Sequence, residues 1–290
     1  MSIATDGRSG SDSNREQILI SETGALYELP FFVLSSDMKR SLTILLIAIL
    51  SSCSAAKDDS IKEEQAKKVM DAYQAGKFSQ VIELTEGIGK GSPWERVRAT
   101  SLQQRGIERF FVADIEGSIA DFDGFLAIFP QEDPHHWQRG LAYYYAEEYK
   151  KGKAQFERHQ MVNTQDVENA VWHFLCAVRA PGGDVKAAQK NLIPIKGDSR
   201  VPMAEVHDLF AGRGTVEDVM AAAKPNNDNT LSEQEKNHLC YAHLYLALYF
   251  EAMGDDEKMK EHIRKAAVDY KMDHYMGKCA QVHAKLRGVE

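Results

Sequence analysis

The sequence lacks the motifs that mark several large enzyme classes. It contains no HExxH zinc motif, no GxSxG nucleophile elbow and no GxxxxGKS or GxxxxGKT phosphate loop. The serine of Gly197-Asp198-Ser199 is expected in a loop between short helices, without the strand-to-helix turn that aims a hydrolase nucleophile. These absences argue against a metalloprotease, a serine hydrolase and a nucleotide-hydrolysing enzyme. We therefore expect no enzymatic activity and no cofactor.

Cysteine is scarce, and histidine forms no metal-binding pattern. None of the four cysteines has CxxC spacing, so Cys176, Cys240 and Cys279 are expected to be small buried residues in helices. In an oxidising compartment Cys240 and Cys279 could pair, and the sequence does not decide whether they do. We expect no metal, because the histidines near the C-terminus have no predicted shared face and suit surface or helix-interface positions: His238, His243, His262, His274 and His283.

The chain has no excess of positive charge. Its formal net charge is −8 at pH 7 and no basic stripe is visible, which argues against a nucleic-acid partner. The composition, 43% hydrophobic and 27% charged, is that of an ordinary folded protein large enough for one solenoid or two small domains.

One apolar run interrupts an otherwise mixed sequence. Residues 42–50 follow the positive Lys39-Arg40, and the run is too short to span a bilayer comfortably. It ends at Leu50-Ser51-Ser52-Cys53, which resembles a bacterial lipobox. The resemblance implies a lipoprotein signal peptide over 38–53, with Cys53 as the lipid attachment site and the new N-terminus.

The position of this signal predicts where translation starts and which residues form a tether. Because signal peptides begin at an N-terminus, we expect translation to start at Met38 and residues 1–37 to be an artefact of the assigned start. Residues 54–61 are short and polar, as expected of a tether. Ser54 after the cysteine is compatible with the outer membrane, facing the periplasm, if the source has two membranes.

Two adjacent blocks repeat one pattern with a fixed offset. Gln104-Arg105-Gly106 recurs as Gln138-Arg139-Gly140, and Phe122 recurs as Phe156, each pair 34 residues apart. Each block contains aromatic residues near the glycine, then a charged turn and a second amphipathic run. This period indicates helix-turn-helix units stacked as a repeat array, and therefore an all-α fold.

The pattern resembles the tetratricopeptide repeat (TPR). With Gly106 and Gly140 at position 8, Phe122 and Phe156 both fall at position 24. Arg105 and Arg139 stand where the commonest form has leucine. The clearest blocks are 101–134, 135–166 and 237–270, and residues 62–91 form a degenerate first repeat.

The resemblance extends to the layout of the chain. The region 62–290 is predicted to be a TPR-like helical-hairpin solenoid with a divergent helical middle and a C-terminal capping helix over 274–286. A lipobox followed by such repeats is similar to the NlpI-like TPR lipoproteins of bacterial envelopes. That resemblance implies a membrane-tethered adaptor that brings proteases or cell-wall hydrolases together. The alternative is a structural subunit of an outer-membrane or envelope assembly complex, and homodimerisation is left open.

In TPR proteins, positions 5, 9, 12 and 13 of the first helix line a concave face, so the resemblance also implies a binding groove. We expect Ile107, Phe111 and Leu141 to pack between repeats. The groove prediction rests on residues that offer aromatic area or a polar tip to a protein partner: Gln103, Phe110, Trp137, Tyr144 and Tyr145.

Overall fold

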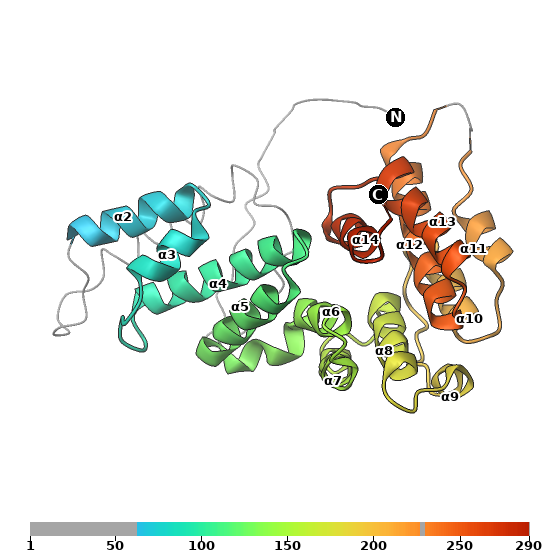
Figure 1. Ribbon diagram of the computed structural model, residues 1–290, viewed down its shortest axis with the longest axis horizontal. Helices are drawn as coiled ribbons and strands as arrows, with labels where there is room; N and C mark the ends of the chain where they lie inside the picture. Colours follow the sequence, from blue (N-terminus) through green and yellow to red (C-terminus); the bar gives the residue numbers. More distant parts are fainter. Residues whose placement is uncertain (1–62, 227–229, 290) are drawn as a thin grey trace, which may run out of the picture. The chain divides into compact units, whose positions relative to one another are not determined.

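The computed structural model describes residues 63–226 and 230–289 (Figure 1). The predicted extension, signal peptide, Cys53 and tether lie outside the described residues. Every regular element in the described part is helical, which confirms the all-α, repeat-like fold class.

The helices follow one another with short connections. The first two hairpins and the 3-10 turn η1 comprise α2 (Glu63–Gln74), α3 (Phe78–Leu84), α4 (Pro93–Phe111), α5 (Ile115–Ile128) and η1 (Pro130–His135). The next segment comprises α6 (Trp137–Tyr145), α7 (Tyr149–Gln160), α8 (Val167–Arg179) and α9 (Val185–Lys190). The C-terminal part comprises α10 (Met203–Phe210), α11 (Val216–Ala222), α12 (Glu233–Met253), α13 (Asp256–Arg264), the π-helical turn η2 (Lys265–Asp269) and α14 (Tyr275–Leu286).

The two central hairpins cross in the same way. Gly106 of α4 faces the ring of Phe122, so a Cβ atom there would lie 2.6 Å from the ring, and one on Gly140 would lie 2.7 Å from Phe156. Both phenylalanines are at most 1% exposed. The recurring Gly and Phe therefore mark a close helix crossing that a larger residue would obstruct.

The turns between paired helices also share one backbone conformation. Gly76, Ala113, Glu147 and Gly254 all have positive φ, at 69°, 66°, 59° and 78°. With Gly106 and Gly140 at repeat position 8, Ala113 and Glu147 both fall at position 15, and Gly76 and Gly254 take the equivalent place between α2 and α3 and between α12 and α13. The left-handed residue allows the second helix of each pair to fold back on the first.

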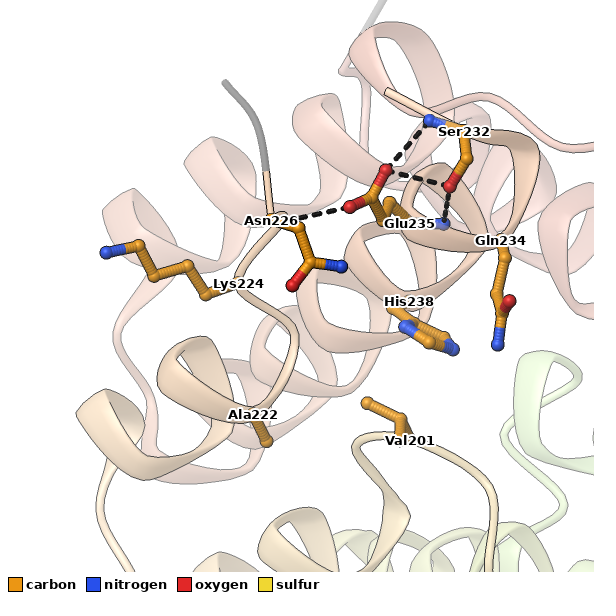
Figure 2. Close-up of a pocket in the computed structure, with 8 residues that line it drawn as sticks. All are labelled: Val201, Ala222, Lys224, Asn226, Ser232, Gln234, Glu235 and His238. Carbon is orange, nitrogen blue, oxygen red and sulfur yellow. Dashed lines mark hydrogen bonds between the residues drawn. The ribbon is translucent and has the colours of Figure 1, made fainter. Parts of the chain in front are cut away.

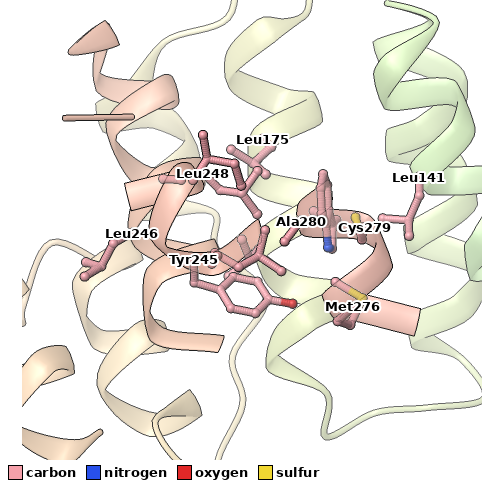
Figure 3. Close-up of a cluster of buried hydrophobic side chains, with 14 of the residues drawn as sticks. Leu141, Leu175, Tyr245, Leu246, Leu248, Met276, Cys279 and Ala280 are labelled. Atoms are coloured by element: carbon pink, nitrogen blue, oxygen red, sulfur yellow. The ribbon is translucent and has the colours of Figure 1, made fainter. Parts of the chain in front are cut away.

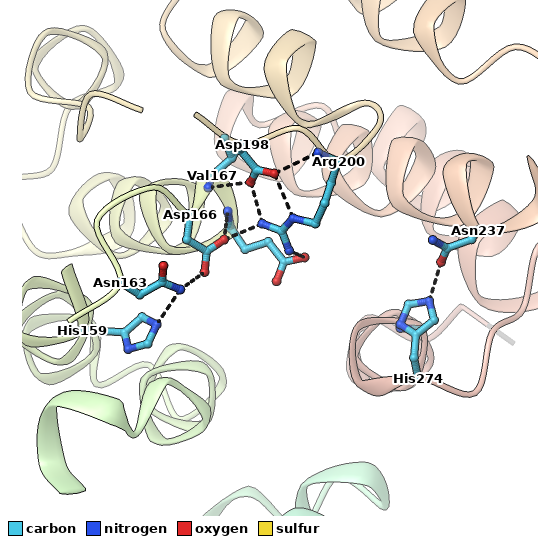
Figure 4. A network of polar contacts seen from close by, with 10 residues as sticks. His159, Asn163, Asp166, Val167, Asp198, Arg200, Asn237 and His274 are labelled. Carbon is cyan, nitrogen blue, oxygen red and sulfur yellow. Dashed lines mark hydrogen bonds and ion pairs between the residues drawn. The ribbon is translucent and has the colours of Figure 1, made fainter. Parts of the chain in front are cut away.

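Ion pairs hold together the irregular region between α8 and α10 (Figure 4). The Arg200 guanidinium lies 2.6 Å from carboxylate oxygens of both Asp166 and Asp198, and 3.2 Å from Glu168. Asp166 caps α8, and Asp198 accepts a hydrogen bond from the Val167 backbone N–H. Arg200 thus holds the non-helical segment after α9 against the beginning of α8.

One large core and one small core stabilise the described residues. The large core joins side chains of α6, α8, α12 and α14, and Figure 3 shows Leu175, Leu248 and Ala280 within it. The small core lies under α2, α3 and the beginning of α4. Cys176, Cys240 and Cys279 are buried, as predicted, and all three are free thiols, so Cys240 and Cys279 do not form a disulfide in this structure.

Candidate functional site

The predicted groove residues lie on α4 and α6, and they differ in exposure. Phe110 and Tyr144 are buried, at 0% and 1% exposed. Gln103, Trp137 and Tyr145 are only partly buried. Gln103 is fixed by its neighbour, because its Oε1 lies 2.6 Å from Nε2 of His136.

Helix α14 covers this face of α4 and α6. Figure 1 shows α14 beside the C-terminal end of α4, which it contacts. The Tyr275 ring lies 5.9 Å from that of Phe110, 5.0 Å from Phe111 and 4.7 Å from Trp137, measured between centroids. Aromatic pairs at these separations attract one another beyond the burial of their area. The beginning of α14 is therefore held by a cluster of rings.

Polar contacts hold the rest of α14. The Tyr145 hydroxyl lies 3.1 Å from Nδ1 of His283 and 3.7 Å from the Cys279 sulfur. At the end of the helix, Lys285 Nζ donates to the Val112 carbonyl oxygen over 2.9 Å. These contacts leave the tyrosine hydroxyl paired although it is removed from water.

A buried carboxylate completes the contact. Glu251 of α12 is 6% exposed and accepts hydrogen bonds from the Tyr144 hydroxyl and from Nε of Arg287, both over 2.6 Å. Burial by itself would raise the pKa of Glu251, but the charge interactions with His283 and Arg287 and the two hydrogen bonds outweigh burial and lower it. Glu251 therefore stays ionised and links α6 to the end of the chain.

Phe110 and Tyr144, which were predicted to contact a partner, are buried in this structure. Phe110 packs against Tyr275, and Tyr144 donates to Glu251, so both serve the chain's own core. Gln103, Trp137 and Tyr145 keep some exposure, but they too contact residues of the same chain. Tyr275, His283 and Arg287 were missed, because nothing in the repeat period relates α14 to α4. A lone Glu251 after the apolar run 244–250 was the available signal.

The cysteine beside this site is not set up as a nucleophile. Burial raises the pKa of Cys279 to about 12, against a smaller lowering by the hydrogen bond with Tyr145. The reactive form of cysteine is the thiolate, which such a pKa suppresses at neutral pH. The contact of Cys279 with Tyr145 is therefore structural.

Histidines of the C-terminal hairpin pair with each other. Nδ1 of His243 lies 2.8 Å from Nδ1 of His262, and the His243 ring stacks on Tyr270. Within residues 63–226 and 230–289, no group of three or more His, Cys, Asp or Glu is arranged to hold a metal ion. In the same ranges, no helix is long and apolar enough to cross a membrane.

A pocket of about 460 Å³ lies apart from this face, around the beginning of α12 (Figure 2). Its polar groups are engaged in helix capping: Ser232 accepts from the Glu235 N–H, and Glu235 accepts from Ser232 and from the Asn226 N–H. Hydrogen bonds to Ser232 and Asn226 lower the pKa of Glu235 to about 2. A carboxylate in that role does not act as a general acid near neutral pH. The pocket is lined by Val201, Ala222, Lys224, Asn226, Ser232, Gln234, Glu235 and His238.

Comparison with known proteins finds no matching family model and no matching curated protein.

Proposed function

We propose that this protein is a noncatalytic adaptor that binds other proteins through its inner face, which is the face formed by α4 and α6. One observation carries the proposal: the face formed by α4 and α6 holds a helix, α14, through aromatic rings and a tyrosine hydroxyl. Tyr and Trp are enriched where proteins bind one another, because each combines a large apolar face with a polar tip. A surface that binds one helix in this way has the chemistry to bind another.

The proposed setting is the bacterial cell envelope, with a lipid on Cys53 as the membrane anchor. This part of the proposal is supported by the order of basic residues, apolar run and lipobox in residues 38–53. The similarity of layout to NlpI-like lipoproteins makes proteases and cell-wall hydrolases the first client class to test.

The test is affinity purification from detergent-solubilised envelopes followed by mass spectrometry. Wild type is compared with Trp137→Ala, which removes a partly exposed ring from the face, and with Met161→Ala as matched control, because Met161 is 68% exposed at the end of α7. We expect a protease or hydrolase to co-purify with wild type and with Met161→Ala, and to decrease roughly tenfold with Trp137→Ala, in line with loss of an aromatic hot spot.

A different outcome would replace the proposal. If one stable set of membrane-assembly proteins co-purifies with all three forms, the protein is a structural subunit of an envelope complex, and the inner face is not its binding surface. If no protein co-purifies with wild type, the adaptor function is contradicted.

A further inference from the structure

Three residues of α14 form one stripe that faces α4 and α6. Tyr275, Cys279 and His283 are spaced four residues apart, which places them on the same side of a helix. Tyr275 meets the rings on α4 and Trp137, whereas Cys279 and His283 meet the Tyr145 hydroxyl. The residues of the stripe thus show which side chains the face of α4 and α6 accepts, and in which order along a helix.

The remainder of α14 is attached to the C-terminal hairpin. The helix contacts η2, α13 and α12, and its buried residues there include the small side chains of Ala280 and Ala284. The rings on α4 and the Tyr145 hydroxyl on α6 therefore meet α14 largely through long side chains. Aromatic side chains of this kind are enriched at the buried centre of protein–protein interfaces.

The connection to α14 suits movement of the helix as a unit. Residues 271–273 have no regular structure, and the helix carries its own N-cap, since Nδ1 of His274 accepts the Gly277 N–H. The cap of α14 therefore does not depend on α4 or α6.

We infer that α14 is an internal competitor for the partner site: the face formed by Phe110, Phe111, Trp137 and Tyr145 binds a partner's helix, and α14 occupies it until displaced. The partner is a helix with an aromatic residue, a small residue four positions later and a hydrogen-bonding residue four positions after that. This inference rests on the proposed function and names the chemistry of the partner and its regulation. Binding of the partner is weakened by the fraction of molecules in which α14 is seated.

The test uses the full-length protein and a fluorescent peptide of residues 271–289 as the probe. The Tyr275→Ala protein loses ring contacts of α14 while its α4 and α6 face is unchanged, so we expect it to bind the peptide roughly tenfold or more tightly than wild type does. A peptide that carries Tyr275→Ala is expected not to bind. Met161→Ala is the matched control, because Met161 is 68% exposed at the end of α7 and the change leaves the ring contacts of α14 in place; we expect it to bind the peptide as wild type does.

A second variant and a second measurement guard against misfolding. Lys285→Ala removes the exposed contact with Val112 and is expected to strengthen peptide binding to a smaller degree. Hydrogen exchange of the wild-type protein is expected to show α14 amides opening more readily than those of α12. Equal peptide binding by all forms, or α14 exchange only through global unfolding, would overturn the inference. The peptide assay needs no natural client, so its outcome is separate from that of the envelope purification.

Discussion

Ala113 and Glu147 occupy a backbone conformation that glycine adopts freely and other residues do not. Their φ values of 66° and 59° lie in the left-handed region, where a side chain costs roughly 1–2 kcal/mol. The equivalent turns use Gly76 and Gly254. The repeat alignment identified the four turns, but it did not reveal that two of them carry strain.

Replacing Glu147 with glycine should stabilise the protein. Glu147 is exposed and forms no ion pair within residues 63–226 and 230–289. We therefore expect Glu147→Gly to raise the free energy of unfolding by about 0.5–1 kcal/mol, which is the relief of strain less the added entropy of the unfolded chain. Urea unfolding followed by circular dichroism measures the change. Gly254→Ala is the control: no atom crowds that position, and we expect it to destabilise by about 1 kcal/mol. A loss of stability in Glu147→Gly, or no loss of stability in Gly254→Ala, would contradict this account of the turns.

The contacts of Arg105 and Arg139 explain why arginine stands where the commonest repeat has leucine. Arg105 donates two hydrogen bonds to the Asp121 carboxylate, over 2.8 and 2.6 Å, and Arg139 donates two to Gln155 Oε1. Each partner lies 16 residues downstream, on the second helix of its hairpin. The arginines thus join paired helices by hydrogen bonds where leucine would do so by apolar contact.

At the scale of the helix pair, the glycine of each Arg-Gly dipeptide sets how closely the helices approach. Gly140 lies so close to Phe156 that a Cβ atom on the glycine would be 2.7 Å from the phenylalanine ring. The spacing of glycine and phenylalanine was readable in the sequence, since both recur after 34 residues. The close approach itself is a property of the packed pair.

We expect Gly140→Ala to lower the free energy of unfolding by about 1–3 kcal/mol, the usual range for overpacking a tight core. Phe156→Leu should remove the clash, so the double variant Gly140→Ala/Phe156→Leu should be more stable than the sum of the two single variants indicates. The measurement is a double-mutant cycle by thermal or urea unfolding. Strict additivity would show that the two side chains do not meet.

At the scale of the whole molecule, buried histidines link stability to pH. Burial lowers the pKa of His136 and of His243 to about 3, with further lowering by Arg139 and by His262 respectively, and burial lowers that of His283 to about 4. All three are at most 4% exposed. The folded state therefore binds fewer protons than the unfolded state, whose histidines titrate near pH 6.5. Their contribution is fully present above pH 6.5 and is lost as the pH falls below it.

One group acts in the opposite direction. Burial raises the pKa of Glu168 to about 7, against the lowering by Arg200, so this carboxyl favours the folded state as the pH falls. For these four groups, three histidines against one glutamate leave a net loss of about 2 kcal/mol in the free energy of unfolding between pH 6.5 and 5.5. Burial also lowers the pKa of four further histidines, which add to the loss: His159, His173, His262 and His274. Urea unfolding at the two pH values measures it. His136→Asn, which keeps an N-cap acceptor, should reduce the loss by about 1 kcal/mol; stability that stays constant or rises on acidification would contradict the prediction.

The sequence was sufficient to predict the helical fold class, the 34-residue period and the burial of Cys176, Cys240 and Cys279. The recurring Gly106 and Gly140, for example, do mark close helix crossings with Phe122 and Phe156. These features depend on periodicity and on contacts within a turn or a hairpin, which are local in the chain.

Only the tertiary structure decided what the aromatic face of α4 and α6 contacts. The hydrogen bond from Tyr144 to Glu251 spans 107 residues, and the one from Lys285 to Val112 spans 173. The position of α14 relative to α4 and α6 depends on the sum of the rotations between successive helix pairs. These pairs include a middle region without a regular repeat. No local pattern encodes that sum, so the sequence predicted a helix over 274–286 without showing that it packs against α4 and α6.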